Sequence, residues 1–232
     1  MKLKAVLFDL DGTLLPLEQD VFTRTYFELM TKKLMPYGYP PDKLIEAVWD
    51  MASNDGTMTN EERFWKKFCE LFGKDSLKDK YVFEDFYQNE FYEIKKVCGY
   101  NELVRDAVML AKSLGLKVAV ATNPLFPAVA TNTRLAWTGV TEEDFELVTT
   151  YENSHYSKPG LKFYTEVLEK LGVEPHETLM VGNDTLDDMI AEELGIDVFL
   201  ITDYLVNRQN KDISAYKKGS FKDLINYLEN LK

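Results

Sequence analysis

Two aspartates separated by a single residue, Asp9 and Asp11, stand at the end of a short apolar run near the start of the chain. In an extended segment, residues two apart point to the same side, so the two carboxylates share one small volume. Two anions this close destabilise each other unless one takes up a proton or a cation lies between them. A divalent ion with oxygen ligands, most commonly Mg²⁺, resolves that conflict. The spacing therefore predicts a metal-dependent site, with Gly12 letting the backbone turn sharply behind the acids.

The apolar run itself, Ala5 to Phe8, is typical of a strand that is buried on both faces of a parallel sheet. The residues just beyond it could alternatively form an ordinary Asp-Gly turn. That turn accounts for Asp11 and Gly12, but it gives Asp9, at the end of an apolar strand, no reason to be charged. We therefore favour the functional interpretation.

The second half of the chain alternates between helices and strands. The pattern predicts helix 101–114, strand 117–122, helix 125–137, strand 146–150, helix 160–171, strand 178–182, helix 185–194, strand 197–201 and helix 221–231. Alternation with short links implies right-handed crossovers between parallel strands. We expect an α/β fold with a doubly wound parallel sheet, to which the first strand, residues 3–8, also belongs.

Polar residues follow several of these strands. Thr122 and Asn123 end the second strand, Lys158 lies in the loop after the third, and Gly182-Asn183-Asp184 follow the fourth. Open α/β sheets bind ligands beyond the carboxyl ends of their strands, so these groups are expected to meet the two aspartates there. A metal ion and an anion could be held around one point. Each residue also has a local interpretation, as a strand, turn, solvated loop or helix-cap residue.

Between the first strand and this alternation, helix follows helix. Residues 18–35, the stretch from Pro41 to Met51, the stretch after a capping box at Thr59, and residues 77–96 are each predicted to be helical. We expect residues 1–16 and 98–232 to form the α/β core and residues 17–97 to form an inserted helical cap. The two crossing points should lie close together over the sheet end that carries Asp9, which makes the insertion a lid.

Four motifs in order carry a family resemblance: Asp9-Leu10-Asp11-Gly12-Thr13, Thr122-Asn123, Lys158-Pro159 and Gly182-Asn183-Asp184-Thr185-Leu186-Asp187-Asp188. On these motifs the chain resembles the haloacid dehalogenase-like (HAD) hydrolase superfamily. The resemblance covers the whole chain, because the inserted helices resemble the cap that this family places between its first and second motifs.

The resemblance implies a role for each motif residue. Asp9 would attack phosphorus and form an aspartyl-phosphate, and Asp11 would serve as general acid and then as general base. The phosphoryl oxygens would be held by Thr122, the Asn123 backbone and Lys158. Mg²⁺ would be bound by Asp9, the Asp11 backbone carbonyl and Asp184, with Asp188 supporting that shell or orienting Lys158.

One position departs from the commonest family pattern, in which an acid directly follows the glycine of the fourth motif. Here Asn183 follows Gly182, and the acid comes at Asp184. In one register Asn183 is a neutral ligand and Asp187 or Asp188 supplies the charge. In the other, Asp184 is the ligand and Asp188 lies four residues on. We choose the second, because Mg²⁺ beside a phosphate favours charged oxygens and the acid-x-x-x-acid spacing is kept.

Asp11 narrows the reaction, since relatives that dehalogenate organic acids lack a carboxylate two residues after the nucleophile. A phosphatase acting on a small phosphorylated metabolite is therefore favoured. A phosphomutase of the same superfamily remains an alternative, as does, from a different class, a signalling domain that accepts a phosphoryl group without turnover. Polar candidates for substrate selection in the lid all have a structural interpretation that we rank first; they are Asn54, Thr59, Asn60 and Arg63.

The composition limits the partners. The 232 residues carry a net charge of −12, which disfavours nucleic acid and anionic membranes, although a metal and a lysine still permit a phosphate. Cys69 and Cys98 are too few for a disulfide framework, and no apolar stretch is long enough for a membrane span or a signal peptide. We expect a cytoplasmic protein, a monomer or small homo-oligomer, without nucleic-acid or membrane partners.

Overall fold

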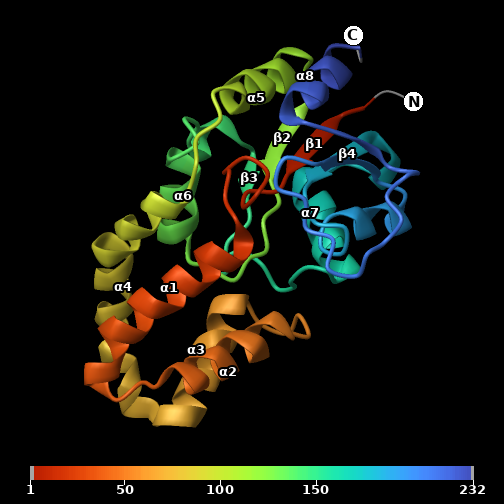
Figure 1. Ribbon diagram of the computed structural model, residues 1–232. Helices are drawn as coiled ribbons and strands as arrows, with labels where there is room; N and C mark the ends of the chain where they lie inside the picture. The colour runs from red at the N-terminus through yellow and green to blue at the C-terminus, as the bar shows by residue number, and fades with distance from the viewer. Residues whose placement is uncertain (1–2, 231–232) are drawn as a thin grey trace.

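The computed structural model describes residues 3–230 and contains one six-stranded parallel sheet (Figure 1). Its strand order is β3-β2-β1-β4-β5-β6. The first strand is central, with Phe8 opposite Val120 on one side and Val181 on the other. The predicted doubly wound parallel sheet is confirmed. The strands are β1 (Ala5–Phe8), β2 (Lys117–Val120), β3 (Leu147–Val148), β4 (Thr178–Gly182), β5 (Asp197–Ile201) and β6 (Lys217–Gly219).

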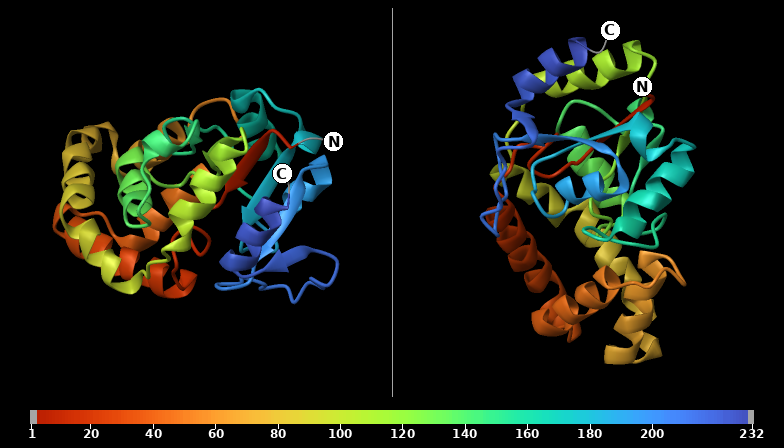
Figure 2. Two further views of the ribbon diagram at one scale, coloured as in Figure 1. Left: turned by 90° about the horizontal axis from the view of Figure 1, so that it is seen from above. Right: turned by 90° about the vertical axis from the view of Figure 1, so that its right-hand side faces the viewer.

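Helices cover both faces of this sheet (Figures 1 and 2). Alternate residues of β1 point to opposite faces, so Val6 and Phe8 join the core beneath α5, α6 and α8, while Leu7 packs toward α7 and η6. All of β1 is buried, which explains its unbroken apolar sequence. The helices of this part are α5 (Leu103–Ser113), α6 (Ala128–Ala136), η4 (Glu142–Asp144), α7 (Leu161–Leu171), η5 (Pro175–Glu177), η6 (Met189–Leu194) and α8 (Phe221–Glu229).

Residues 17–97, called the helical segment below, lie beyond the sheet end at which β1 finishes (Figure 1). Their aromatic side chains continue the core of one sheet face, with Phe68 and Phe86 fully buried. The capping box at Thr59 and Glu62 is present, as the sequence predicts. The elements are α1 (Gln19–Leu34), η1 (Met35–Tyr37), α2 (Pro41–Ala52), α3 (Asn60–Phe72), η2 (Lys74–Asp79), α4 (Lys80–Gln88) and η3 (Glu90–Val97).

The two chain crossings into and out of the helical segment lie side by side. Leu17 and Cys98 form an antiparallel bridge, and the backbone N–H of Gly99 donates to the Pro16 carbonyl at 2.6 Å. The crossings therefore form a two-stranded neck next to the loop that carries Asp9 and Asp11. Division of the chain at residues 16 and 98 stays a prediction.

Several predicted boundaries differ from the structure. Helix 77–96 is interrupted at Asn89, whose backbone leaves the helical region. Helix 125–137 begins only at Ala128, because Pro127 occupies its N-cap position. Helix 185–194 is replaced by a turn followed by the short η6, and the edge strand β6 was not predicted at all. Residue 231, the end of the last predicted helix, lies outside the described residues.

Within residues 3–230, the helices are all too short or too polar to cross a membrane. The start of β1 and the end of α8 lie near each other, on the side of the sheet away from the helical segment (Figures 1 and 2).

Candidate active site

The loops at the carboxyl ends of β1, β2 and β4, with the loop before α7, surround one cavity of about 110 Å³. All seven site residues predicted from the sequence line it: Asp9, Asp11, Thr122, Asn123, Lys158, Asp184 and Asp188. The same cavity is also lined by Asn183 and Asp187, which belong to the register that was not chosen, and by four residues that the prediction did not include, namely Gln19, Leu125, Phe126 and Arg208. The sheet edge thus brings together residues up to 199 positions apart, from Asp9 to Arg208.

The β1 strand delivers the two aspartates to this cavity. The Asp9 backbone N–H donates to the Val181 carbonyl at 2.9 Å, which continues the sheet by one residue. The chain then turns at Gly12, where φ is +85°. A Cβ atom at this position would lie 2.3 Å from Nδ2 of Asn183, so both the backbone angle and the available space require glycine.

Lys158 lies between two of the carboxylates. Its Nζ donates to Asp9 Oδ1 at 2.8 Å and to Asp188 Oδ1 at 2.6 Å, and its side chain is only 1% exposed. Burial opposes the charge, but the carboxylates of Asp188 and Asp9 hold the pKa of Lys158 well above its ordinary value. The lysine is therefore a fixed positive charge at the base of the cavity.

One ammonium does not neutralise the acids around it. Burial raises the pKa of Asp9, against the opposing effect of Lys158, and the charge of Asp11 raises it further. Burial raises the pKa of Asp188 in the same way. Burial and the neighbouring Asp184 also raise the pKa of Asp187 to about 6. The cavity therefore carries an excess of negative charge that a bound cation would relieve.

The loop after β4 gives Asn183 and Asp184 different surroundings. Asn183 is buried, accepts a hydrogen bond from Thr13 Oγ1 at 3.1 Å and donates to the Tyr204 carbonyl at 2.6 Å. Its amide is thus used to join three segments of chain. Asp184 accepts at Oδ1 from the backbone N–H groups of residues 186 and 187, which leaves Oδ2 as its second acceptor.

Arg134 is a residue of this site that the sequence analysis missed. It lies on α6, is fully buried, and donates from Nη1 to Oδ2 of Asp11. Its guanidinium carbon lies 4.3 Å from the centre of the Phe126 ring. In the sequence it looks like an ordinary basic residue of a last helical turn, where Arg is common on the surface. No signal in a single sequence distinguishes the two situations.

Two polar atoms at the cavity have no hydrogen-bond partner within residues 3–230: Oδ1 of Asp11 and Oδ1 of Asn123. Buried polar atoms without partners are rare in folded proteins, and beside a cavity they indicate where a ligand binds. Because the carboxylates around the cavity offer oxygen ligands, the residues present suit a hard cation such as Mg²⁺.

A complete cluster of metal-binding side chains is not formed. Among the described residues, no three Asp, Glu, His or Cys side chains are placed to hold an ion together. The expected ligand set requires only two carboxylates, of Asp9 and Asp184, with the Asp11 backbone carbonyl. The residues present are compatible with that set.

The polar candidates of the helical segment have structural partners instead of lining the cavity. Arg63 pairs with Asp50, and Asn54 donates to the Met58 carbonyl. Asn60, which is fully buried, donates to the carbonyls of residues 124 and 156 and so attaches the start of α3 to the core loops. From the helical segment, Gln19 is the polar residue that lines the cavity.

Comparison with known proteins identifies a family. The model of the haloacid dehalogenase-like hydrolases matches residues 3–195, which includes every residue that lines the cavity except Arg208. This range spans the central strands of the sheet and the helical segment.

Individual relatives differ in their named substrates. A glyceraldehyde 3-phosphate phosphatase from Methanocaldococcus jannaschii is 31% identical over 128 residues, about half of each chain (54% of both). A pyrophosphatase from Bacillus cereus is 24% identical over 94% of this chain and 90% of that protein. Among solved structures, a 2-haloacid dehalogenase from Pseudomonas syringae matches with a TM-score of 0.63 at 18% identity, covering 99% of this chain and 100% of that one. At this identity the structural match concerns the fold alone.

Proposed function

This chain belongs to the haloacid dehalogenase-like hydrolases, and we propose that it is a Mg²⁺-dependent phosphatase that hydrolyses a small phosphate monoester through an aspartyl-phosphate at Asp9. One of its relatives is named a glyceraldehyde 3-phosphate phosphatase and another a pyrophosphatase. Because these names give different substrates, neither substrate is assigned to this chain.

In the first step, an oxygen of the Asp9 carboxylate forms a bond to phosphorus, and the bond from phosphorus to the ester oxygen breaks. Asp11 gives a proton to that oxygen, so that an alcohol leaves instead of an alkoxide. Arg134 binds Oδ2 of Asp11, so Oδ1, which has no hydrogen-bond partner among the described residues, is the oxygen left for this proton transfer.

In the second step, a water oxygen attacks phosphorus while Asp11 takes a proton from that water. The bond between phosphorus and Asp9 breaks, which releases inorganic phosphate and restores both carboxyl groups to their starting states. Thr122, Asn123 and Lys158 hold the phosphoryl oxygens through both steps, because charge builds up on those oxygens as the bonds change.

Asp9, Asp184 and the Asp11 backbone carbonyl would hold the Mg²⁺ ion. When bound, the ion offsets the repulsion between the phosphate and the carboxylates and stabilises negative charge on the transferring group. Asp188 acts indirectly: its Oδ1 binds Lys158 and its Oδ2 accepts from the Asp184 backbone N–H at 2.9 Å, so it fixes the relative positions of both.

This proposal rests on one observation. Lys158 donates hydrogen bonds to both Asp9 and Asp188, beside a cavity that Thr122 and Asn123 also line. The test is release of inorganic phosphate from 4-nitrophenyl phosphate, with Mg²⁺ and with EDTA, by the natural chain and by Asp9→Asn. We expect release only by the natural chain with Mg²⁺. Undiminished release by Asp9→Asn or in EDTA would contradict the proposal.

The same assay separates the alternatives. A phosphomutase would move a phosphoryl group between positions of a sugar phosphate with little net release of phosphate. A signalling domain would retain one phosphoryl group per chain and stop.

A further inference from the structure

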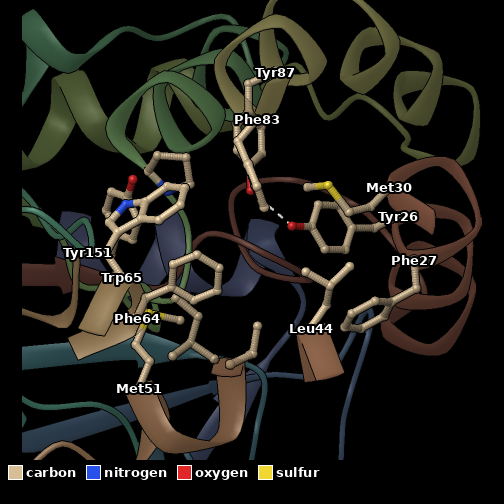
Figure 3. Close-up of a pocket in the computed structure, with 13 residues that line it drawn as sticks. Tyr26, Phe27, Met30, Leu44, Met51, Phe64, Trp65, Phe83, Tyr87 and Tyr151 are labelled. Carbon is tan, nitrogen blue, oxygen red and sulfur yellow. Dashed lines mark hydrogen bonds between the residues drawn. The ribbon is translucent and has the colours of Figure 1, made fainter. Parts of the chain in front are cut away.

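A second cavity, of about 50 Å³, lies between the helical segment and the core (Figure 3). Side chains from α1, α2, α3 and α4 point into it, among them Tyr26, Leu44, Phe64 and Tyr87. From the core side it is closed by Leu125 and Pro127, which follow β2, and by Tyr151, which follows β3.

The lining of this cavity is uncharged and mostly apolar. None of its lining residues is Asp, Glu, Lys, Arg or His. The hydroxyl groups of Tyr26 and Tyr87 bond to each other at 2.9 Å. Burial raises the pKa of Tyr26 to about 12 and holds the pKa of Tyr87 well above its ordinary value, so both phenols are neutral. A charged group placed here would lose its hydration and find no opposite charge.

Leu125 connects this cavity to the active site, because it lines both. It is two residues beyond Asn123, and its backbone N–H donates to the Asn123 carbonyl at 2.8 Å. A phosphoryl group held at Asn123 therefore has Leu125 as a neighbour and the apolar cavity beyond it. Pro124 lies between Asn123 and Leu125, and its carbonyl accepts a hydrogen bond from the Asn60 side chain at 3.2 Å. This bond fixes the boundary between the two cavities.

We propose that the apolar cavity receives the organic group of the substrate, and that the substrate is a phosphate monoester of a short apolar alcohol. This inference rests on the proposed phosphatase function and adds the chemical class of its leaving group. The phosphate stays among Thr122, Asn123 and Lys158, and the carbon chain passes Leu125 into the space between Tyr26, Leu44 and Phe64.

The size of the cavity limits the alcohol. A space of 50 Å³ is well below the roughly 150 Å³ that hold a benzene ring in an engineered protein cavity. It is about four times the roughly 10–15 Å³ that a single water-sized group needs. The cavity therefore suits a chain of about four carbon atoms, whereas a ring such as that of 4-nitrophenyl phosphate stays outside it.

The test measures kcat/KM for phosphate release across the series methyl, ethyl, propyl, butyl, hexyl and octyl phosphate. Each methylene group that enters the cavity should raise kcat/KM about fourfold, so butyl phosphate, with three more methylene groups, should exceed methyl phosphate by about 60-fold. The value should fall for the longer chains. A matched ester that ends in a carboxylate should be poorer than butyl phosphate.

Variants of the lining then locate the effect. Met30→Ala enlarges the cavity and should move the optimum to a longer chain, whereas Val48→Ile narrows it and should move the optimum to a shorter one. Met35→Ala, in the same helical segment but at a side chain that is 52% exposed, is the matched control and should leave the optimum in place.

Acetyl phosphate keeps this inference separate from the proposed function. Its organic part is too short to fill the cavity, so it reports on phosphoryl chemistry alone. If acetyl phosphate and the alkyl series are all inert, the proposed function fails. If acetyl phosphate is hydrolysed but chain length has no effect, or if Met30→Ala and Val48→Ile leave the optimum unchanged, the cavity is a packing void and the inference is wrong.

Discussion

Asp9 and Asp11 lie two positions apart in the chain, and the fold gives them different partners. Asp9 binds the ammonium of Lys158 in the loop before α7, and Asp11 binds the guanidinium of Arg134 on α6. The two carboxylates therefore have separate hydrogen-bond partners in the same cavity. This difference in surroundings agrees with the proposed roles, in which Asp9 attacks phosphorus and Asp11 moves a proton.

Replacement of Asp11 should therefore depend on the leaving group. Asp11→Asn removes the proton donor, so turnover of alkyl phosphates should fall by roughly 10²–10⁴-fold. Turnover of 4-nitrophenyl phosphate should fall much less, because its departing oxygen is already a stable anion. The two kcat values are compared in one preparation. Equal losses for both substrates would make Asp11 a structural or metal-binding residue only.

Arg134 should show its role through stability. Arg134→Gln leaves the Asp11 carboxylate half-buried without its counter-charge and should lower the free energy of unfolding by about 3 kcal/mol. Adding Asp11→Asn to the same chain should recover a large part of that loss, because no charge is then left unpaired. Urea unfolding of both single variants and the double variant measures the coupling. Strictly additive losses would contradict a direct interaction between the two side chains.

A Mg²⁺ titration distinguishes Asp184 from Asn183 as the proposed metal ligand. Asp184→Ala should raise the Mg²⁺ concentration for half-maximal activity far more than Asn183→Ala or Asp187→Ala. Asn183→Ala should instead lower thermal stability, since its amide holds Thr13 and the Tyr204 carbonyl. A titration in which Asn183→Ala is the most impaired variant would reverse the choice of register.

At the scale of elements, the loops after the strands and the helical segment depend on each other. The start of α3 is attached to the core by the Asn60 and Glu61 backbone N–H groups, which donate to carbonyls of the loop after β3 at 2.8 Å each. The Asn60 side chain adds the bond to the carbonyl of residue 124. The helical segment is therefore joined to the loop after β2 as well as to the neck at residues 17 and 98.

Loss of the Asn60 side chain should loosen this attachment. Asn60→Ala leaves buried carbonyls without donors and should lower the free energy of unfolding by about 1–3 kcal/mol. It should also raise KM for alkyl phosphates, since the boundary of the apolar cavity moves. Asn89→Ala, which removes an exposed side-chain bond to the Asp85 carbonyl, is the control. If both variants have equal stability and equal KM values, Asn60 does not connect the two parts.

The elements that the sequence predicted best are those whose burial follows a simple rule. Residues 178–182 and 197–201 are apolar strands of a parallel sheet, and their predicted bounds agree with the structure. Strand β3, at one edge of the sheet, is shorter than predicted, and β6, at the other edge, was missed because Lys217 and Lys218 resemble a solvated loop. Residues 185–188 were predicted as part of a helix, but they form a turn in which the carboxylates of Asp184 and Asp188 bind backbone N–H groups.

At the scale of the whole molecule, chain topology explains why the site residues could be located from sequence. Parallel strands end at one sheet edge, so acids, amide and lysine at successive strand ends meet without any knowledge of side-chain packing. Arg134 and the apolar cavity could not be located in this way. Both depend on which side of a helix faces inward and on how aromatic side chains from four helices pack, and their sequence pattern is that of ordinary core residues.

The arrangement of acids in the whole molecule also accounts for part of the net charge of −12. Several acids are gathered at the cavity, where burial and mutual repulsion raise the pKa values of Asp9, Asp187 and Asp188. A phosphate enters such a site only if a cation reverses the local sign. The proposed requirement for Mg²⁺ and the proposed nucleophile, Asp9, therefore rest on the same cluster of acids.

The most direct measurement is chemical trapping of the phosphoryl group on Asp9. The enzyme is mixed with butyl phosphate and Mg²⁺, quenched during turnover and treated with borohydride, which reduces an acyl phosphate of aspartate to homoserine. Peptide mass spectrometry then locates the change. We predict homoserine at position 9 in the natural chain, none in EDTA, and none in Asp9→Asn. Turnover without any reduction at position 9, or reduction at another aspartate such as Asp184, would contradict the assignment of Asp9 as the nucleophile.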